Sequence, residues 1–337
     1  MGKLAGNYSI DSNKIAFFKD VYALGEIVSI KDQMVVDTDT SEKYIFVLSD
    51  GKKCFLKRIP DYAADQKAMT DRNSFVSFLL SQGFATPSIY STKLGQSWVE
   101  YESATWILYS CESGEKFKDE ANCSFYTGSF LAEFHSLSER YLKCKGKVST
   151  ASTSMLFIDL VIENVPAVKL DKGLLNKVEG LKQKCQAYRD SESFKALECI
   201  WVHGDFSPNN ILYNNDKAAW LVDFDNAHVN TKIHDLAELY LTSTVFEYAN
   251  NSTNFGGDIP LWDAFIKNEP LFNGYQSKVN LSKEEKKMFG DIMILVYLEL
   301  VFLGTLRGDY AIDGQKVDGI ISACLHIKNI SEELLEG

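Results

Sequence analysis

The sequence His203-Gly-Asp-Phe-Ser-Pro-Asn-Asn-Ile-Leu212, with Trp220-Leu-Val-Asp-Phe-Asp225 shortly after it, carries three spaced polar residues. Asp205 precedes Asn210 by five residues, and Asn210 precedes Asp223 by thirteen. Apolar runs typical of short strands lie beside them: Cys199–Val202, Ile211–Tyr213 and Ala219–Phe224. Asn214-Asn-Asp-Lys217 predicts a turn between the last two strands. We therefore expect the chain to return on itself so that Asn210 and Asp223 meet.

These residue types suit phosphoryl transfer from a nucleotide. Such a transfer needs a carboxylate beside the accepting hydroxyl and oxygen ligands for Mg²⁺ on the phosphates. Asp205 is the candidate catalytic residue. Asn210 and Asp223 are the candidate metal ligands, because Mg²⁺ accepts one or two carboxylates together with phosphate oxygens and water. The alternative is that all three are ordinary turn residues, since Asp and Asn are common in turns.

The first 110 or so residues are typical of a small, mainly antiparallel sheet with one helix. The expected strands are Tyr22–Ile30, Lys43–Leu48, Lys53–Ile59, Trp98–Tyr101 and Thr105–Ser110. The Asp-Gly pair in Ser49-Asp-Gly-Lys52 predicts a hairpin, and the spacing of apolar residues predicts a helix over Asp65–Ser81. After Gly114 helical periodicity dominates, so we expect an α+β chain with two lobes.

Composition excludes several classes of function. The 337 residues carry a formal net charge of -11, which argues against binding a nucleic acid backbone and slightly favours a cationic partner. The seven cysteines are scattered without a Cys-x-x-Cys pair, so we expect no zinc site and a reducing, cytoplasmic setting. The most apolar stretch, Met293 to Leu303, is interrupted by Glu299 and is about half the roughly 20 residues that a bilayer requires. We therefore expect no association with a membrane.

Several of these motifs resemble those of the aminoglycoside phosphotransferase and choline kinase superfamily, relatives of the protein kinases. The kinase motif His-Arg-Asp-x-x-x-x-Asn appears as His203-Gly-Asp205 with Asn210, and Asp-Phe-Gly appears as Asp223-Phe-Asp225. Further family-like stretches are Tyr22-Ala-Leu-Gly25, Leu131-Ala-Glu-Phe-His135, Asp235-Leu-Ala237, and Gly274-Tyr275 with Leu281-Ser-Lys-Glu284. The last pair resembles homoserine-kinase-like and spore-coat-kinase-like members.

The resemblance covers nearly the whole chain and implies a bilobal protein-kinase-like fold. Residues 1–110 would form the nucleotide-binding lobe, an antiparallel sheet with one helix. Residues 111–337 would form the larger, mainly helical lobe for catalysis and substrate binding.

The resemblance also implies roles for residues outside the central motifs. Lys57, on the third strand, would contact the nucleotide phosphates, and backbone groups from Tyr109 to Cys111 would bind adenine. His203 would orient the loop by hydrogen bonding. Asp225 would be either a second metal contact or an anchor for its own loop.

Two departures from the family pattern concern the phosphate site. No Gly-x-Gly-x-x-Gly lies between the first strands, where Asp37–Glu42 carries Ser41 as the candidate phosphate contact. The glutamate that would pair with the lysine falls close to Arg72, a reversal of charge. Asp71 is the expected substitute.

The implied activity is transfer of the γ-phosphate of ATP, or GTP, to a hydroxyl of a small molecule, assisted by Mg²⁺, with Asp205 as base. Acceptors of the aminoglycoside, amino alcohol, sugar and amino acid types all fit. The alternatives are a nucleotide-binding protein without catalysis that acts through protein interaction, and a kinase for protein side chains.

Overall fold

The computed structural model describes residues 10–32, 42–117, 121–145, 186–188, 190–251, 268–307 and 314–336, together with Gly180 and Gln183. The chain forms two compact units. The first contains residues up to 114 and the segment Trp220–Asp225, and the second contains residues 115–219 and those from 226 onward. One unit is built on a sheet and the other mainly on helices, so the expected α+β class is confirmed.

The first unit is built on a five-stranded antiparallel sheet with strand order β1-β2-β3-β5-β4. The strands are β1 (Ile27–Asp32), β2 (Lys43–Leu48), β3 (Lys53–Arg58), β4 (Val99–Tyr101) and β5 (Ala104–Ser110). The expected strand from Tyr22 was wrong at its start, because a helix, α1 (Ser12–Val21), precedes β1 and Tyr22 caps its end. Asp11 starts this helix by accepting a hydrogen bond from the amide of Lys14.

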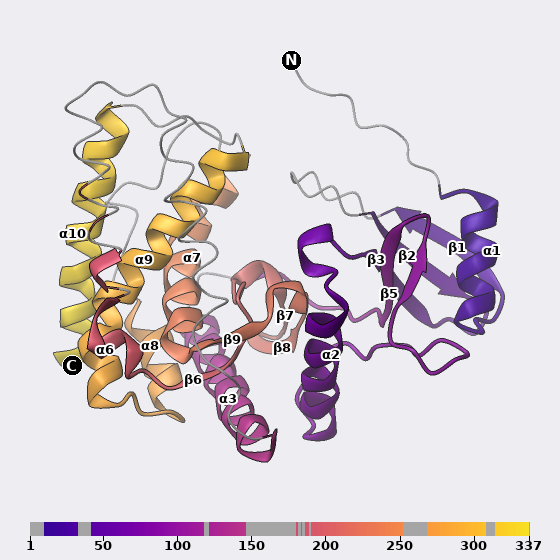
Figure 1. Ribbon diagram of the computed structural model, residues 1–337, viewed down its shortest axis with the longest axis horizontal. Coiled ribbons are helices and arrows are strands. Elements are labelled where there is room, and N and C mark those ends of the chain that lie inside the picture. Colours follow the sequence, from indigo (N-terminus) through magenta and orange to yellow (C-terminus); the bar gives the residue numbers. More distant parts are fainter. Residues whose placement is uncertain are drawn as a thin grey trace. The chain divides into compact units, whose positions relative to one another are not determined.

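Two helices cover opposite sides of this sheet (Figure 1). Phe18 of α1 packs against Leu56 and Trp106, which lie on one face. The predicted helix is α2 (Gln66–Ser81), capped by Asp65, and its Met69 packs against Ile107 on the other face. Alternate residues of a strand face opposite sides, so Lys57 of β3 lies on the face away from Leu56.

The second unit contains the helices α3, α6, α7, α8, α9 and α10. Their bounds are Ala121–Lys145, Glu192–Lys195, Lys232–Asn251, Glu269–Gln276, Lys283–Arg307 and Gly314–Glu336. Strand β6 (Cys199–Val202) pairs antiparallel with β9 (His228–Thr231). Strand β7 (Ile211–Asn214) pairs with β8 (Lys217–Leu221) in the predicted hairpin. Strand β8 ends before the expected Phe224, because the backbone at Asp223 turns to a φ of 67°.

Two glycines allow α3 and α8 to cross closely. A Cβ atom on Gly128 would overlap the carbonyl oxygen of Leu271, and one on Gly274 would overlap the carbonyl oxygen of Phe125. The helices therefore meet through their backbones, so neither glycine can be exchanged without moving a helix.

None of the described helices has an apolar stretch long enough to cross a membrane. The location of the protein in the cell stays a prediction.

Candidate active site

Lys57 is a charged residue that β3 carries into the interior of the first unit. Its side chain is 4% exposed, and its Nζ lies 2.6 Å from Oδ1 of Asp223 and 2.7 Å from Oδ2 of Asp225. Burial alone would lower the pKa of Lys57, but Asp225 and Asp223 together raise it above its usual value. The lysine is therefore held as a cation between two carboxylates.

The two carboxylates lie on a short segment after β8 and differ in access. Asp223 has a left-handed φ of 67°, which costs a residue other than glycine about 1 kcal/mol or more. A 3₁₀ turn, Phe224–Asn226, follows at once. The side chain of Asp223 is 33% exposed, whereas that of Asp225 is 6% exposed. The carboxylate of Asp223 is therefore accessible to a ligand, whereas that of Asp225 is buried.

Arg72 of α2 reaches the same segment. Its Nη1 donates to the backbone carbonyl of Asp225, and its Nη2 donates to the carbonyl of Ala63 at 2.9 Å. Arg72 is 5% exposed, whereas Asp71 is exposed, because successive residues of a helix point about 100° apart. The structure does not bring Asp71 to Lys57, so the expected pairing of these two residues is corrected to Asp223 and Asp225.

In the second unit, Asp235 in the first turn of α7 binds the loop at His203. Its carboxylate accepts hydrogen bonds from the amides of His203 and Gly204, at 2.7 and 2.9 Å. The ring of His135 joins this carboxylate, 3.3 Å from Nε2, to the hydroxyl of Tyr275, 2.9 Å from Nδ1. Burial would raise the pKa of Asp235, but its hydrogen bonds with His135 and with the amide of His203 keep that pKa below its usual value.

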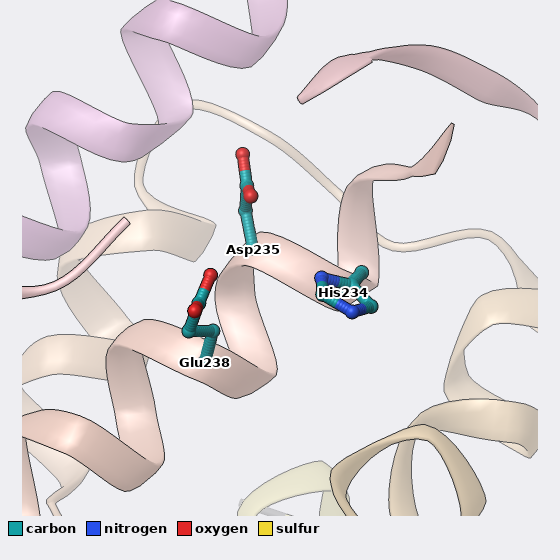
Figure 2. A group of neighbouring side chains, drawn as sticks. All are labelled: His234, Asp235 and Glu238. Carbon is teal, nitrogen blue, oxygen red and sulfur yellow. The ribbon is translucent and has the colours of Figure 1, made fainter. Parts of the chain in front are cut away.

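Glu238 holds the same loop on the other side of Asp205. One turn after Asp235, its Oε2 accepts a hydrogen bond from the amide of Phe206 at 3.1 Å. Figure 2 shows the carboxylates of Asp235 and Glu238 on one side of α7, as a spacing of three residues requires. Burial, and after it the charge of Asp205, raises the pKa of Glu238 well above its usual value.

The backbone of Asp205 is fixed from its own loop as well. Its carbonyl accepts hydrogen bonds from the amide of Ser207 and from Nδ2 of Asn210, both at 2.9 Å. Gly204 has a φ of 72°, and a Cβ atom there would overlap the carbonyl oxygen of Asn226, so the position requires glycine. The side chain of Asp205 is only partly buried, so a rigid backbone presents an accessible carboxylate.

Three neighbouring side chains of α7 have the geometry of a cation site. Ligand atoms of His234, Asp235 and Glu238 lie within 4.8 Å of one another. Asp235 and Glu238 already bind backbone amides, however, and Nε2 of His234 lies 3.2 Å from Oε2 of Glu299. Burial would lower the pKa of His234, but Glu299 raises it to about 9. We therefore interpret His234, Asp235 and Glu238 as structural residues rather than as a metal site.

A family model, that of the phosphotransferase enzyme family, matches residues 35–258. The chain belongs to the phosphotransferase enzyme family. The match includes Lys57, Asp205, Asn210 and Asp223, so the resemblance noted in the sequence is confirmed. No curated protein sequence matches the chain.

Solved structures of phosphotransferases share the fold of the chain. An amicoumacin kinase, hAmiN, is 13% identical with a TM-score of 0.65, over 96% of this chain and 94% of that one. An aminoglycoside phosphotransferase from Alicyclobacillus acidocaldarius is 16% identical with a TM-score of 0.59, over 94% and 93%. The choline kinase LicA from Streptococcus pneumoniae is 13% identical with a TM-score of 0.57, over 95% and 100%. The expected kinase-like bilobal class is confirmed.

The remaining expected nucleotide contacts of this phosphotransferase-family chain stay predictions. Ser41 lies outside the described residues. Tyr109 lies in β5, paired with Phe55 of β3. Cys111 follows β5, and its amide donates to the carbonyl of Lys53 at 3.3 Å. The division of function between residues 1–110 and 111–337 also stays a prediction.

His203 is completely buried in the second unit. Its ring makes edge contacts with Phe134 and Phe206, with centroids 6.4 and 5.7 Å away. This packing favours the structural role expected for His203 over a catalytic one.

Two residues of the site were not assigned from the sequence. Arg72 marked only a reversal of charge, and the sequence motifs gave no role to Glu238. The spacing of Glu238, three residues after Asp235, was the available signal, because it places both carboxylates on one face of a helix.

Glu238→Gln is expected to change how stability depends on pH. Because the pKa of Glu238 is raised on folding, its contribution to stability is complete below the pKa of the unfolded chain, about 4.3, and is lost as pH rises through the folded pKa. Glutamine keeps an oxygen that accepts from Phe206 and cannot ionise. The melting temperature of the variant relative to wild type should therefore be higher at pH 8 than at pH 5.

Melting temperatures across this pH range measure the effect. The control is Glu192→Gln, whose side chain is 91% exposed in the same unit and should show a constant difference. A constant or opposite trend for Glu238→Gln would contradict the burial of a protonated carboxyl.

Proposed function

We propose that the chain transfers the terminal phosphate of ATP, or GTP, to a hydroxyl group of a small molecule. Membership of the phosphotransferase enzyme family supports this class of reaction. The observation that carries the proposal is the loop of Asp205, because Asp235 and Glu238 bind the amides on both sides of one accessible carboxylate. An active base needs such a fixed position beside the reacting hydroxyl.

In this reaction the bond between the terminal phosphorus and the nucleotide oxygen breaks, and a bond to the acceptor oxygen forms. Asp205 accepts the hydrogen bond of the acceptor hydroxyl, aligns its oxygen for in-line attack and takes up the proton. Lys57 binds the negatively charged phosphates. The side chain of Lys57 is already held in place by Asp223 and Asp225, which reduces the reorganisation that this role requires.

Asn210 and Asp223 fit the ligand chemistry of Mg²⁺. Asn210 uses its Nδ2 to donate to the carbonyl of Asp205, which leaves the amide oxygen as its ligand atom. Asp223 offers a partly exposed carboxylate. When bound, Mg²⁺ would neutralise the charge of the phosphates.

The acceptor is proposed only by class. The amicoumacin kinase was solved with AMP-PNP, Ca²⁺ and Ami. Its bound AMP-PNP supports a nucleotide donor, and it and the choline kinase both support a small-molecule acceptor. The acceptor classes that we propose are aminoglycosides, amino alcohols, sugars and amino acids. The net charge of -11 is compatible with a cationic acceptor.

A turnover screen tests the proposal. Purified protein with MgATP or MgGTP is incubated with a panel of hydroxyl compounds, and release of the nucleoside diphosphate is measured. Thermal shifts with each nucleotide are recorded in parallel, because a ligand at 100 times its Kd stabilises the folded state by about 2.7 kcal/mol. We expect stabilisation by one nucleotide and acceptor-dependent release of its diphosphate.

Two results would contradict this expectation. Stabilisation by nucleotide without turnover of any acceptor would favour the non-catalytic nucleotide-binding protein. Phosphate found on co-incubated proteins, and on no small molecule, would favour a kinase for protein side chains.

A further inference from the structure

The pairing of Lys57 raises the question of which acid orients it. In the described part of the chain, two carboxylates lie within ion-pair distance of Nζ of Lys57. They belong to Asp223, at 2.6 Å, and Asp225, at 2.7 Å. Both belong to the first compact unit, as do Lys57 and Arg72. Removal of a buried lysine's counter-charge is costly, so at least one of the two acids must stay with Lys57 until a phosphate supplies the negative charge.

Accessibility separates the two acids. The side chain of Asp223 is 33% exposed and can turn toward a metal ion or a phosphate. The side chain of Asp225 is 6% exposed, and its pKa is raised first by burial, with Lys57 opposing that effect. A carboxylate that is buried and paired with Lys57 at 2.7 Å is less available than Asp223 to an ion that also binds water and phosphate oxygens.

Arg72 accounts for how Asp225 is held. Its guanidinium, on α2, donates to the carbonyl of Asp225 and to the carbonyl of Ala63. Arg72 is 5% exposed and contacts two neutral oxygens, so it fixes the backbone of Asp225 rather than competing with Lys57 for its carboxylate. Helix α2 therefore positions Asp225 through the backbone carbonyl of that residue.

Charge balance supports this arrangement. Arg72 and Lys57 carry two positive charges and Asp223 and Asp225 two negative ones, so the charges of these four residues balance. A glutamate at position 72 would leave three acids around one lysine and would cost several kcal/mol of desolvation. Arg72 therefore stands close to where the family has the glutamate that pairs with the lysine, and Asp225 supplies the acid in its place.

We propose that Asp225 is the acid that orients Lys57 for the phosphates, and that Arg72 is a positioning residue that fixes Asp225. This inference rests on the proposed function and deepens it. It assigns Asp225 to Lys57 rather than to the metal ion, and it leaves Asp223 as the carboxylate that exchanges between Lys57 and Mg²⁺.

The first test measures the reactivity of Lys57 with an amine-directed acylating reagent at fixed pH, read by mass spectrometry in the absence of nucleotide. Asp225→Asn and Arg72→Met should each raise labelling of Lys57 by about three-fold or more, because the lysine loses its fixed partner. Asp223→Asn should change it less than about two-fold, since Asp225 still holds the lysine. Asp71→Asn is the matched control on the exposed face of α2 and should change nothing.

Effects of Arg72→Met and Asp225→Asn should not add in the double variant, because both act through one contact. If Arg72→Met fails to fold, Arg72→Gln keeps one N–H donor and is expected to give a smaller increase in labelling. Labelling raised equally by Asp223→Asn and Asp225→Asn would overturn the assignment of Asp225. Labelling unchanged in a folded Arg72 variant would overturn the role of Arg72.

The second test separates anchoring from metal binding. The Mg²⁺ concentration that gives half of the ADP-dependent thermal shift should rise about ten-fold or more in Asp223→Asn and stay within two-fold of wild type in Asp225→Asn. An equal rise in both variants would make Asp225 a metal ligand and overturn the inference. If wild type binds no nucleotide, the proposed function fails, while the labelling experiment still decides the roles of Asp225 and Arg72.

Discussion

Asp205→Asn is expected to lower turnover by about 10² to 10⁴-fold while leaving the affinity for MgATP within a few-fold of wild type. The amide has the size of the carboxylate but cannot take up the proton of the acceptor hydroxyl. The hydrogen bonds that hold the loop come from backbone amides and from Asn210, so the substitution leaves them in place. The loss should therefore appear in kcat rather than in nucleotide binding.

Initial rates with an acceptor found by the turnover screen, together with a nucleotide titration by thermal shift, measure this effect. The matched control is Asp216→Asn in the turn between β7 and β8, where a φ of 63° is readily adopted by asparagine. This control should keep wild-type turnover. Residual activity above a tenth of wild type in Asp205→Asn would remove Asp205 from the role of base.

Gly274→Ala is expected to destabilise the protein by about 3 kcal/mol, which lowers the melting temperature of a chain of this length by about 4 °C. The added methyl group would overlap the carbonyl oxygen of Phe125 on α3, and backbone cannot turn aside as a flexible side chain can. Relief requires α8 to move away from α3. Gly128→Ala should act similarly, because its Cβ would overlap the carbonyl oxygen of Leu271.

Thermal unfolding by circular dichroism measures the change. Gly25→Ala is the control, since a Cβ atom there meets nothing within 4 Å. The displaced α8 carries Tyr275, whose hydroxyl contacts His135 and through it Asp235. We therefore expect turnover of Gly274→Ala to fall even at temperatures where the variant is folded. A melting temperature within 2 °C of wild type would show that the helices can separate at little cost.

Local sequence patterns predicted those helices and strands that depend on residues close together in the chain. Strands β2 and β3, the turn before β8 and the helix after Asp65 follow from alternation, turn residues and capping. The central motif also predicted Asp205, Asn210 and Asp223 as one functional group, and that grouping stays a prediction. Their individual roles stay predictions.

Elements that depend on distant partners could not be predicted in this way. Strand β9 is only four residues, His228–Thr231, and exists because it pairs with β6 about thirty residues earlier. Asp223 leaves the strand pattern although Val222 and Phe224 continue it, because its backbone takes a left-handed φ. The spacing of α2 did not show that Arg72 rather than Asp71 faces inward, since that depends on which side of the helix meets the sheet.

The grouping of Trp220–Asp225 with the first unit has a consequence for how such chains can be cut or recombined. A fragment that ends at Gly114 would keep Lys57 but lose both of its acidic partners, and Arg72 would lose the carbonyl of Asp225. An unpaired buried charge costs about 3 to 5 kcal/mol. Such a fragment would be expected to unfold or to expose its lysine. Exchange of residues 1–114 between relatives would therefore succeed only if Trp220–Asp225 were exchanged with them.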